Sequence, residues 1–257
     1  MQFLAAVAFS VGSGLFLLGA VILFEQFGPI ERYSMQERLP GILMNAVGTI
    51  LTIFMMYPLS LLWDAIGIAP AITLPLWQWL EPLGTTGYLL QFVLLVLVVD
   101  FLAYWRHRTE HKIFWPVHAV HHSPRELHAA NDIGHPFQAL FSLAFIGIPM
   151  SLIQVDGPAM PFVIGAFTSM LAIYIHSPVE LHFGPLRRIV VDNRYHRIHH
   201  SLEERHFNKN FGICFSFWDT LFGTAYDPGE EWPAVGLADT PAPRTVADYL
   251  KLPFRRA

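Results

Sequence analysis

Residues 82–111 read PLGTTGYLLQFVLLVLVVDFLAYWRHRTEH, which joins a membrane-length apolar segment directly to a pair of histidines. Residues 82–99 contain no Asp, Glu, Lys or Arg, and a helix needs about 20 mainly apolar residues to cross a bilayer. We expect this helix to continue past the membrane edge. His107 and His111 then lie one turn apart on one face, as two ligands of one metal ion must. Glu110 points elsewhere, so this is not the HExxH pattern of a metalloprotease.

The composition of the whole chain also indicates a membrane protein. Of 257 residues, 53% are hydrophobic and only 14% are charged, against about 25% charged in a typical soluble domain. The 13 histidines are an unusual number for such an apolar chain. A net charge of −4 gives no support for nucleic-acid binding. The single cysteine, Cys214, excludes an internal disulfide and a cysteine-based metal site.

Five uncharged stretches have the length of a membrane span. They are residues 1–24, 39–63, 82–99, 133–155 and 157–179. Residues 65–80 are also uncharged but contain two prolines, so we interpret them as an interfacial or re-entrant segment. The expected fold is an all-α integral membrane protein of four to five transmembrane helices with a cytoplasmic, histidine-rich helical cap. We divide it into an N-terminal membrane region (1–80), a catalytic domain (81–226) and a peripheral C-terminal tail (227–257).

The basic residues indicate the orientation of these spans. Lys and Arg are absent from residues 39–105 and 126–186 and cluster in the segments between and after them. With five spans, all the basic clusters fall on one side, which the positive-inside rule assigns to the cytoplasm. All 13 histidines fall on that same side. We therefore expect an inner-membrane or endoplasmic-reticulum-type protein with its histidines facing the cytoplasm.

Two copies of the pattern HxxHH follow the first histidine pair. They are His118-Ala-Val-His121-His122 and His196-Arg-Ile-His199-His200. On a helix, the first histidine of each copy neighbours the other two, so we expect each copy to present three imidazoles in one direction. Eight histidines in three motifs exceed the roughly four ligands of one ion, which indicates a dinuclear centre. Imidazole suits iron, zinc, copper and nickel, so the motifs alone do not name the metal.

The order HxxxH, HxxHH, HxxHH on a membrane scaffold resembles the fatty acid hydroxylase/sterol desaturase superfamily of integral-membrane di-iron oxygenases. The resemblance covers roughly residues 95 to 226. Besides the three motifs it rests on the following residues: Asp100, Tyr104, Ser123, His135-Pro136, His176, Gly184-Pro185-Leu186, Asn208-Lys-Asn-Phe-Gly212 and Phe217-Trp-Asp-Thr-Leu-Phe-Gly-Thr224.

The resemblance implies two iron ions as cofactors, O2 as co-substrate, a lipid substrate from the bilayer and a separate electron-donor protein. It implies ten metal-binding histidines: His107, His111, His118, His121, His122, His135, His176, His196, His199 and His200. We expect Asp100, Tyr104 and Asn208 to contact these ligand side chains on the side that faces away from the metal. We expect Asp100 in particular to accept a hydrogen bond from a ligand imidazole or from an arginine. His128, His182 and His206 receive no role.

The sequence departs from the family pattern at two places and leaves the reaction open. His176 is followed by Ser177-Pro178 where an asparagine is often found, and Asn131-Asp132 stand where more neutral residues are expected. Both departures bear on the class of substrate more than on the metal centre. The predicted reaction is hydroxylation of a fatty acyl, sterol-like or carotenoid C–H bond, with desaturation as the near alternative. A metal transporter or haem-binding electron carrier, and a di-zinc hydrolase, are the alternatives of other classes.

Overall fold

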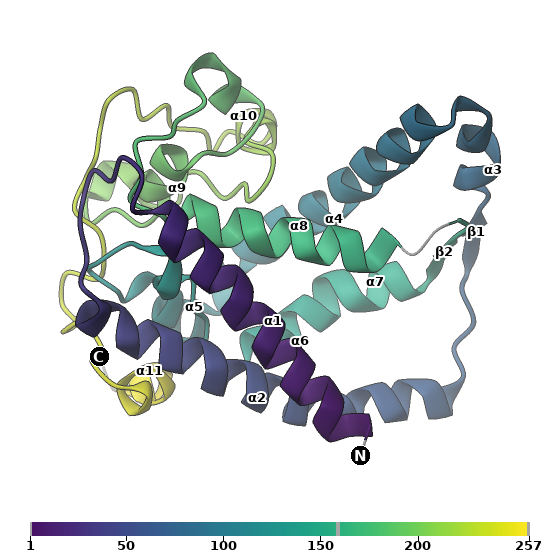
Figure 1. Ribbon diagram of the computed structural model, residues 1–257, viewed down its shortest axis with the longest axis horizontal. Coiled ribbons are helices and arrows are strands. Elements are labelled where there is room, and N and C mark those ends of the chain that lie inside the picture. The colour runs from purple at the N-terminus through teal and green to yellow at the C-terminus, as the bar shows by residue number, and fades with distance from the viewer. Residues whose placement is uncertain (1, 158–159, 256–257) are drawn as a thin grey trace.

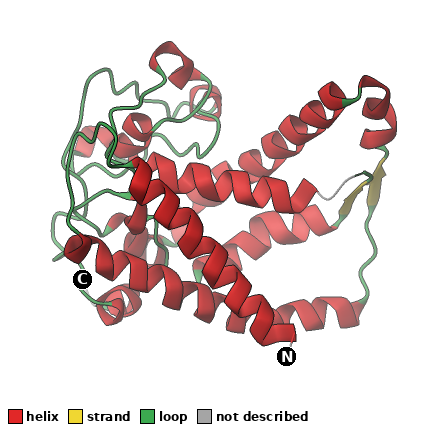
Figure 2. Cartoon of the chain, viewed as in Figure 1, coloured by secondary structure: helices red, strands yellow, loops and turns green. Residues whose placement is uncertain are grey.

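The computed structural model describes residues 2–157 and 160–255 of the chain, and they are mostly helical (Figures 1 and 2). The helices are α1 (Gln2–Phe24), α2 (Met35–Ile66), α3 (Leu76–Leu80), α4 (Thr85–Ile113), α5 (Trp115–His122), α6 (Gln138–Ser142), α7 (Ile148–Ser151), α8 (Met160–Ile175), α9 (Asn193–His199), α10 (Phe217–Leu221) and α11 (Val246–Lys251). A π-helical turn, Leu143–Gly147, joins α6 to α7. Short 3₁₀ turns cover Glu81–Leu83, Ala129–Asn131, Gly184–Arg188, Glu204–His206 and Leu252–Phe254. The strands are β1 (Ile72–Leu74) and β2 (Ile153–Val155).

Within the described residues, three helices are long and apolar enough to cross a membrane: α1, α2 and α4. The first three predicted spans are therefore confirmed as long apolar helices, and α4 continues to Ile113 as expected. A capping box fixes the start of α2, because Ser34 and Glu37 each bond the other's backbone N–H. The fourth and fifth predicted spans contain shorter apolar helices, Gln138–Ser151 and α8.

The helices radiate from one end of the molecule (Figure 1). The chain runs toward this end along α1, α4 and α8, and away from it along α2 and the α6–α7 segment. At the opposite end, β1 pairs in parallel with β2, with Thr73 opposite Gln154. These two three-residue strands depart slightly from the predicted all-α fold. β1 lies in residues 65–80, and β2 lies at the end of the fourth predicted span. Their pairing connects the segment that contains the two prolines to the end of that span.

The end where α1, α4 and α8 finish carries a cap formed by α5, α9, α10, α11 and long loops (Figure 2). Within the described part of the C-terminal tail, the segment around α11 packs into this cap. Tyr249 and Leu252 are buried and share a hydrophobic cluster with Met44 of α2 and Val120 of α5. The sequence does not reveal this contact, because the tail is rich in proline and charge and nothing in the spacing of its apolar residues shows that they insert beside the histidine helix.

Candidate metal centre

Four separate segments bring histidines to the inner side of the cap. The last turns of α4 carry His107 and His111, and α5 carries one HxxHH motif. The second HxxHH motif spans α9 and its C-cap residue His200, with Asp192 capping the helix start by accepting from the backbone N–H of Tyr195. His176 directly follows α8. The site thus draws on segments far apart in the sequence.

Nine of these histidines form two groups whose ligand atoms lie within 4.8 Å of one another in each group. The five-histidine group consists of His107, His111, His118, His122 and His199. The four-histidine group consists of His121, His176, His196 and His200. The groups adjoin, since the rings of His122 and His200 stack with centroids 4.4 Å apart. This arrangement matches what two neighbouring ions require.

Each HxxHH motif divides its histidines between the two groups, which corrects the expectation that all three point one way. His118 and His122 belong to the five-histidine group, whereas His121 belongs to the four-histidine group. The second motif does the reverse, because His196 and His200 belong to the four-histidine group and His199 to the other. The reason is helical geometry: adjacent residues are turned by about 100° around the axis. Neighbouring histidines of each motif therefore belong to different groups.

Backbone carbonyls fix the outward-facing nitrogen of several rings. His107 Nδ1 lies 2.9 Å from the Phe211 carbonyl, and His199 Nδ1 lies 2.8 Å from that of Lys209. His121 Nδ1 and His176 Nδ1 lie 2.9 and 2.6 Å from the carbonyls of Ile133 and Ala172. A carbonyl only accepts, so each Nδ1 must carry the proton. The lone pair of Nε2 then faces the interior of its group, which is the form that binds a metal.

The inward-facing nitrogens crowd together in a way that a cation would explain. Nε2 of His111 lies 3.1 Å from that of His122 and 3.2 Å from that of His199. In the four-histidine group, Nε2 of His196 lies 3.2 Å from His176 and 3.1 Å from His200. One N–H can satisfy only one such contact, so converging lone pairs need a shared positive centre. The donor set therefore fits two metal ions, one in each group.

The imidazoles outside the three long apolar helices are held neutral. Burial, followed by repulsion from neighbouring imidazoles, keeps the pKa of His118, His122, His196 and His200 well below the ordinary value. Burial also lowers the pKa of His121 and of His176, each to about 4. Because only neutral imidazole coordinates a metal, the protein holds these ligands in the binding form.

The structure does not bring His135 into either group. Its Nδ1 accepts from the backbone N–H of Phe137, and its ring lies against Phe137. His182 is exposed, and His128 is buried beside Asn131 and Tyr33. His206 is buried between Ser201 and Glu231. The family resemblance implied that His135 is a ligand, but here the turn before α6 holds its ring away from both groups.

Of the three residues predicted to support the ligand side chains, Asp100 and Tyr104 make other contacts. Asp100 accepts hydrogen bonds from the backbone N–H groups of Cys214 and Phe215 and from Trp218 Nε1, and not from a histidine. Tyr104 bonds Thr224. Both residues thus fasten α4 to the loop before and after α10. Asn208 lies near a candidate ligand, since it lines one cavity together with His111.

Glu110 is the supporting residue that sequence reasoning missed. Its carboxylate is buried and lies 2.8 Å from His118 Nδ1, and Gln138 contacts both of these side chains. The position next to His111 turns Glu110 away from that histidine's direction, as expected, but α5 folds back and places His118 there. Only the tertiary fold shows this contact.

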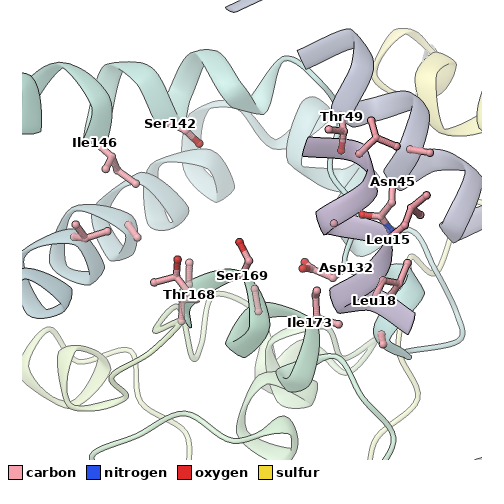
Figure 3. Close-up of a pocket in the computed structure, with 18 of the residues that line it drawn as sticks. Leu15, Leu18, Asn45, Thr49, Asp132, Ser142, Ile146, Thr168, Ser169 and Ile173 are labelled. Carbon is pink, nitrogen blue, oxygen red and sulfur yellow. The ribbon is translucent and has the colours of Figure 1, made fainter. Parts of the chain in front are cut away.

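Two adjoining cavities lie between the helical bundle and the histidines. The bundle cavity, of about 510 Å³, lies among α1, α2, α4, α6 and α8 (Figure 3). The inner cavity, of about 250 Å³, is lined by histidines of both groups, including His107, His121 and His196. The two cavities share Arg106, Asp132, Ala172 and Ile213 in their walls. A molecule entering from the bundle would therefore reach the candidate metal centre past these residues.

The family model described as fatty acid hydroxylase matches residues 92–224, just over half of the chain. The chain therefore belongs to the fatty acid hydroxylase family, as the resemblance predicted. It is 36% identical over 141 residues to ornithine lipid hydroxylase OlsE of Rhizobium tropici, covering 54% of this chain and 42% of that protein. It is 29% identical over 130 residues to alkylglycerol monooxygenase of Homo sapiens, covering 50% of this chain and 29% of that protein.

A third relative aligns over most of both chains. Very-long-chain aldehyde decarbonylase GL1-11 of Oryza sativa subsp. indica is 23% identical over 251 residues, which is 88% of this chain and 87% of that protein. The chain spans less than half the length of the hydroxylase and monooxygenase relatives given above. No solved structure matches the chain.

Proposed function

We propose that this protein is a membrane-bound di-iron oxygenase that hydroxylates a C–H bond of a lipid. The observation that carries the proposal is the pair of adjoining histidine groups with inward-facing Nε2 lone pairs, reached from the bundle cavity. The balanced reaction is R–H + O2 + 2 e⁻ + 2 H⁺ → R–OH + H2O. Membership of the fatty acid hydroxylase family and the names of the hydroxylase and monooxygenase relatives support it.

The residues present fit two iron ions, one held by the five-histidine group and one by the four-histidine group. When bound, iron supplies the site at which O2 is activated, and imidazole is a ligand that suits it. The chain's own contribution is to orient the rings through their Nδ1 contacts, to hold them neutral and to enclose the reacting carbon in a cavity beside them. The bundle cavity opens among apolar helices, so a lipid would enter it from the bilayer.

The wider setting is proposed on the same basis. The names of two relatives specify an ornithine lipid and an alkylglycerol, which favours a lipid with a polar end over a carotenoid. The electrons would come from a separate donor protein. The protein would lie in an inner membrane or an endoplasmic-reticulum-type membrane. The basic clusters favour an orientation with the cap on the cytoplasmic side.

The test combines metal analysis with isotope labelling. The full chain, purified anaerobically in detergent, should hold about two irons, the number that two histidine groups imply. Lipids extracted from a host that expresses the chain under ¹⁸O2 should contain a species with one added ¹⁸O atom, absent from the host alone. Loss of two hydrogens without label would show desaturation instead. Bound haem, or no labelled and no desaturated lipid in any extract, would overturn the proposal.

A further inference from the structure

Arg106 and Asp132 stand at the junction of the two cavities with opposite charges that do not meet. Both residues line the bundle cavity and the inner cavity. No ion pair joins them among the contacts of the described residues, although they face the same passage. Figure 3 shows Asp132 pointing into the bundle cavity together with Ser142 and Ser169. The junction thus offers a positive and a negative group with a gap between them.

The hydrogen-bonding capacity of both groups is only partly used. Arg106 Nη1 donates to Ser142 Oγ at 2.8 Å and lies 3.6 Å from Glu110, but the buried Nε of Arg106 has no partner. The Asp132 carboxylate lies 3.7 Å from His176 Nδ1, which already donates to the Ala172 carbonyl at 2.6 Å. An unpartnered donor on a charged group is unfavourable away from water.

A purely hydrocarbon substrate would leave the charged groups at this junction in a less favourable environment. It would displace water from both charges and return no hydrogen bond to either. A polar group with an acceptor for the guanidinium and a donor for the carboxylate would instead satisfy both at once. The rest of the bundle cavity is suited to a chain, since apolar residues such as Leu15, Ile146 and Ile173 line it.

We propose that Arg106 and Asp132 form a subsite for the polar group of an amphiphilic lipid, a group that carries both a hydrogen-bond donor and an acceptor. This inference rests on the proposed function and narrows its substrate class. The polar group lies between the bundle and the histidines, so the oxidised carbon is close to the polar end of the lipid and not at the far end of its chain. The unexpected acidic residue ahead of His135 in the sequence thereby acquires a role.

The test measures binding of three probes that share one palmitoyl chain. N-palmitoylornithine is charged and has donors and acceptors, N-palmitoylethanolamine is neutral and has both, and methyl palmitate has acceptors only. Dissociation constants are measured by native mass spectrometry on the full, iron-loaded chain in detergent. We expect at least one amide to bind about tenfold more tightly than methyl palmitate, as charge-assisted hydrogen bonds allow. Preference for the ornithine probe alone would define a zwitterion subsite, and equal preference for both amides a neutral one.

The variants separate this role from support of the metal centre. Arg106→Met and Asp132→Leu should each bring the three affinities together when compared at matched iron content, which is measured because Arg106 lies 3.6 Å from Glu110 and Asp132 lies 3.7 Å from His176. Ser169→Ala, which alters only the bundle cavity, should keep the wild-type preference. Equal binding of all three probes to the wild type would overturn the inference. So would an Asp132→Leu protein that loses iron but keeps the preference, because Asp132 would then serve His176. These results do not depend on turnover, so they remain distinct from failure of ¹⁸O incorporation.

Discussion

The Glu110 carboxylate lies 2.8 Å from Nδ1 of His118, while Nε2 of the same ring faces Nε2 of His122 at 3.2 Å. The imidazole is therefore held between an anion on one side and a candidate metal position on the other. A carboxylate behind a histidine fixes the orientation of the ring and raises its basicity as a ligand. Since Glu110 is completely buried, this support is not shared with solvent.

Removing the Glu110 carboxylate should lower the affinity of the five-histidine group for its metal ion. We expect Glu110→Ala to lower metal affinity by about 10- to 100-fold, with Glu110→Gln between that variant and the wild type because the amide oxygen can still accept. Competition with a chelator of known affinity measures the change. Glu180→Ala removes an exposed carboxylate and serves as the control. An affinity that Glu110→Ala leaves at the wild-type level would contradict the assigned contact.

The division of each HxxHH motif gives a second prediction. We expect His121→Ala and His122→Ala each to retain about one ion per chain, and the double variant to retain none, because each residue serves a different group. Metal content of purified protein measures this. His135→Ala should retain both ions, since this ring lies outside both groups. If adjacent histidines shared one ion, the double variant would still hold the other.

The gathering of nine of the ten predicted histidines could be foreseen from the sequence, but their division into two groups could not. Helical spacing gives the pairs His107–His111 and His118–His122, and both pairs lie together as expected. Spacing alone could not show which of two groups receives His121 or His199, because that depends on how α5 and α9 face each other. The long apolar helices α1, α2 and α4 could be predicted from composition, whereas the burial of Tyr249 depends on a long-range contact.

Asp100 has a structural role that can be separated from metal binding. Its carboxylate accepts from two backbone N–H groups and from Trp218 Nε1. Asp100→Asn replaces one acceptor oxygen with a donor group, so a buried N–H loses its partner. We expect a loss of about 1–3 kcal/mol in the free energy of unfolding with unchanged metal content. Thermal unfolding in detergent and metal analysis of the same sample measure both, and loss of metal without loss of stability would revive the predicted role behind a ligand.

The loop between α1 and α2 is tied to the second histidine motif through Glu31 and Arg197. The guanidinium donates to both Glu31 oxygens at 3.0 and 3.1 Å, donates to the Pro233 carbonyl and lies 4.3 Å above the Trp232 ring. Arg197 is buried, whereas the Glu31 side chain is 32% exposed. We expect Arg197→Met to cost about 2–4 kcal/mol and Glu31→Gln about 1 kcal/mol.

Unfolding midpoints of the two variants would test this ranking. Arg205→Met is a suitable control, since Arg205 also pairs with acidic residues but is 54% exposed. Its effect should stay below about 1 kcal/mol, as for other exposed ion pairs. Equal losses for Arg197→Met and Arg205→Met would show that the buried contacts of Arg197 add nothing to stability.

The neutral imidazoles make the metal-free protein sensitive to acid. Burial lowers the pKa of His121 and of His176 to about 4 in the folded protein, against about 6.5 in an unfolded chain. Between these values the unfolded state binds more protons, so stability falls as pH drops from about 6.5 toward 4. A shift of this size corresponds to about 3 kcal/mol for each ring.

Chelator-treated protein should therefore show an unfolding midpoint that falls over this range. The double variant His121→Gln, His176→Gln should show a shallower fall, because glutamine does not titrate. A pH dependence identical in variant and wild type would mean that these two rings are not held neutral by the fold.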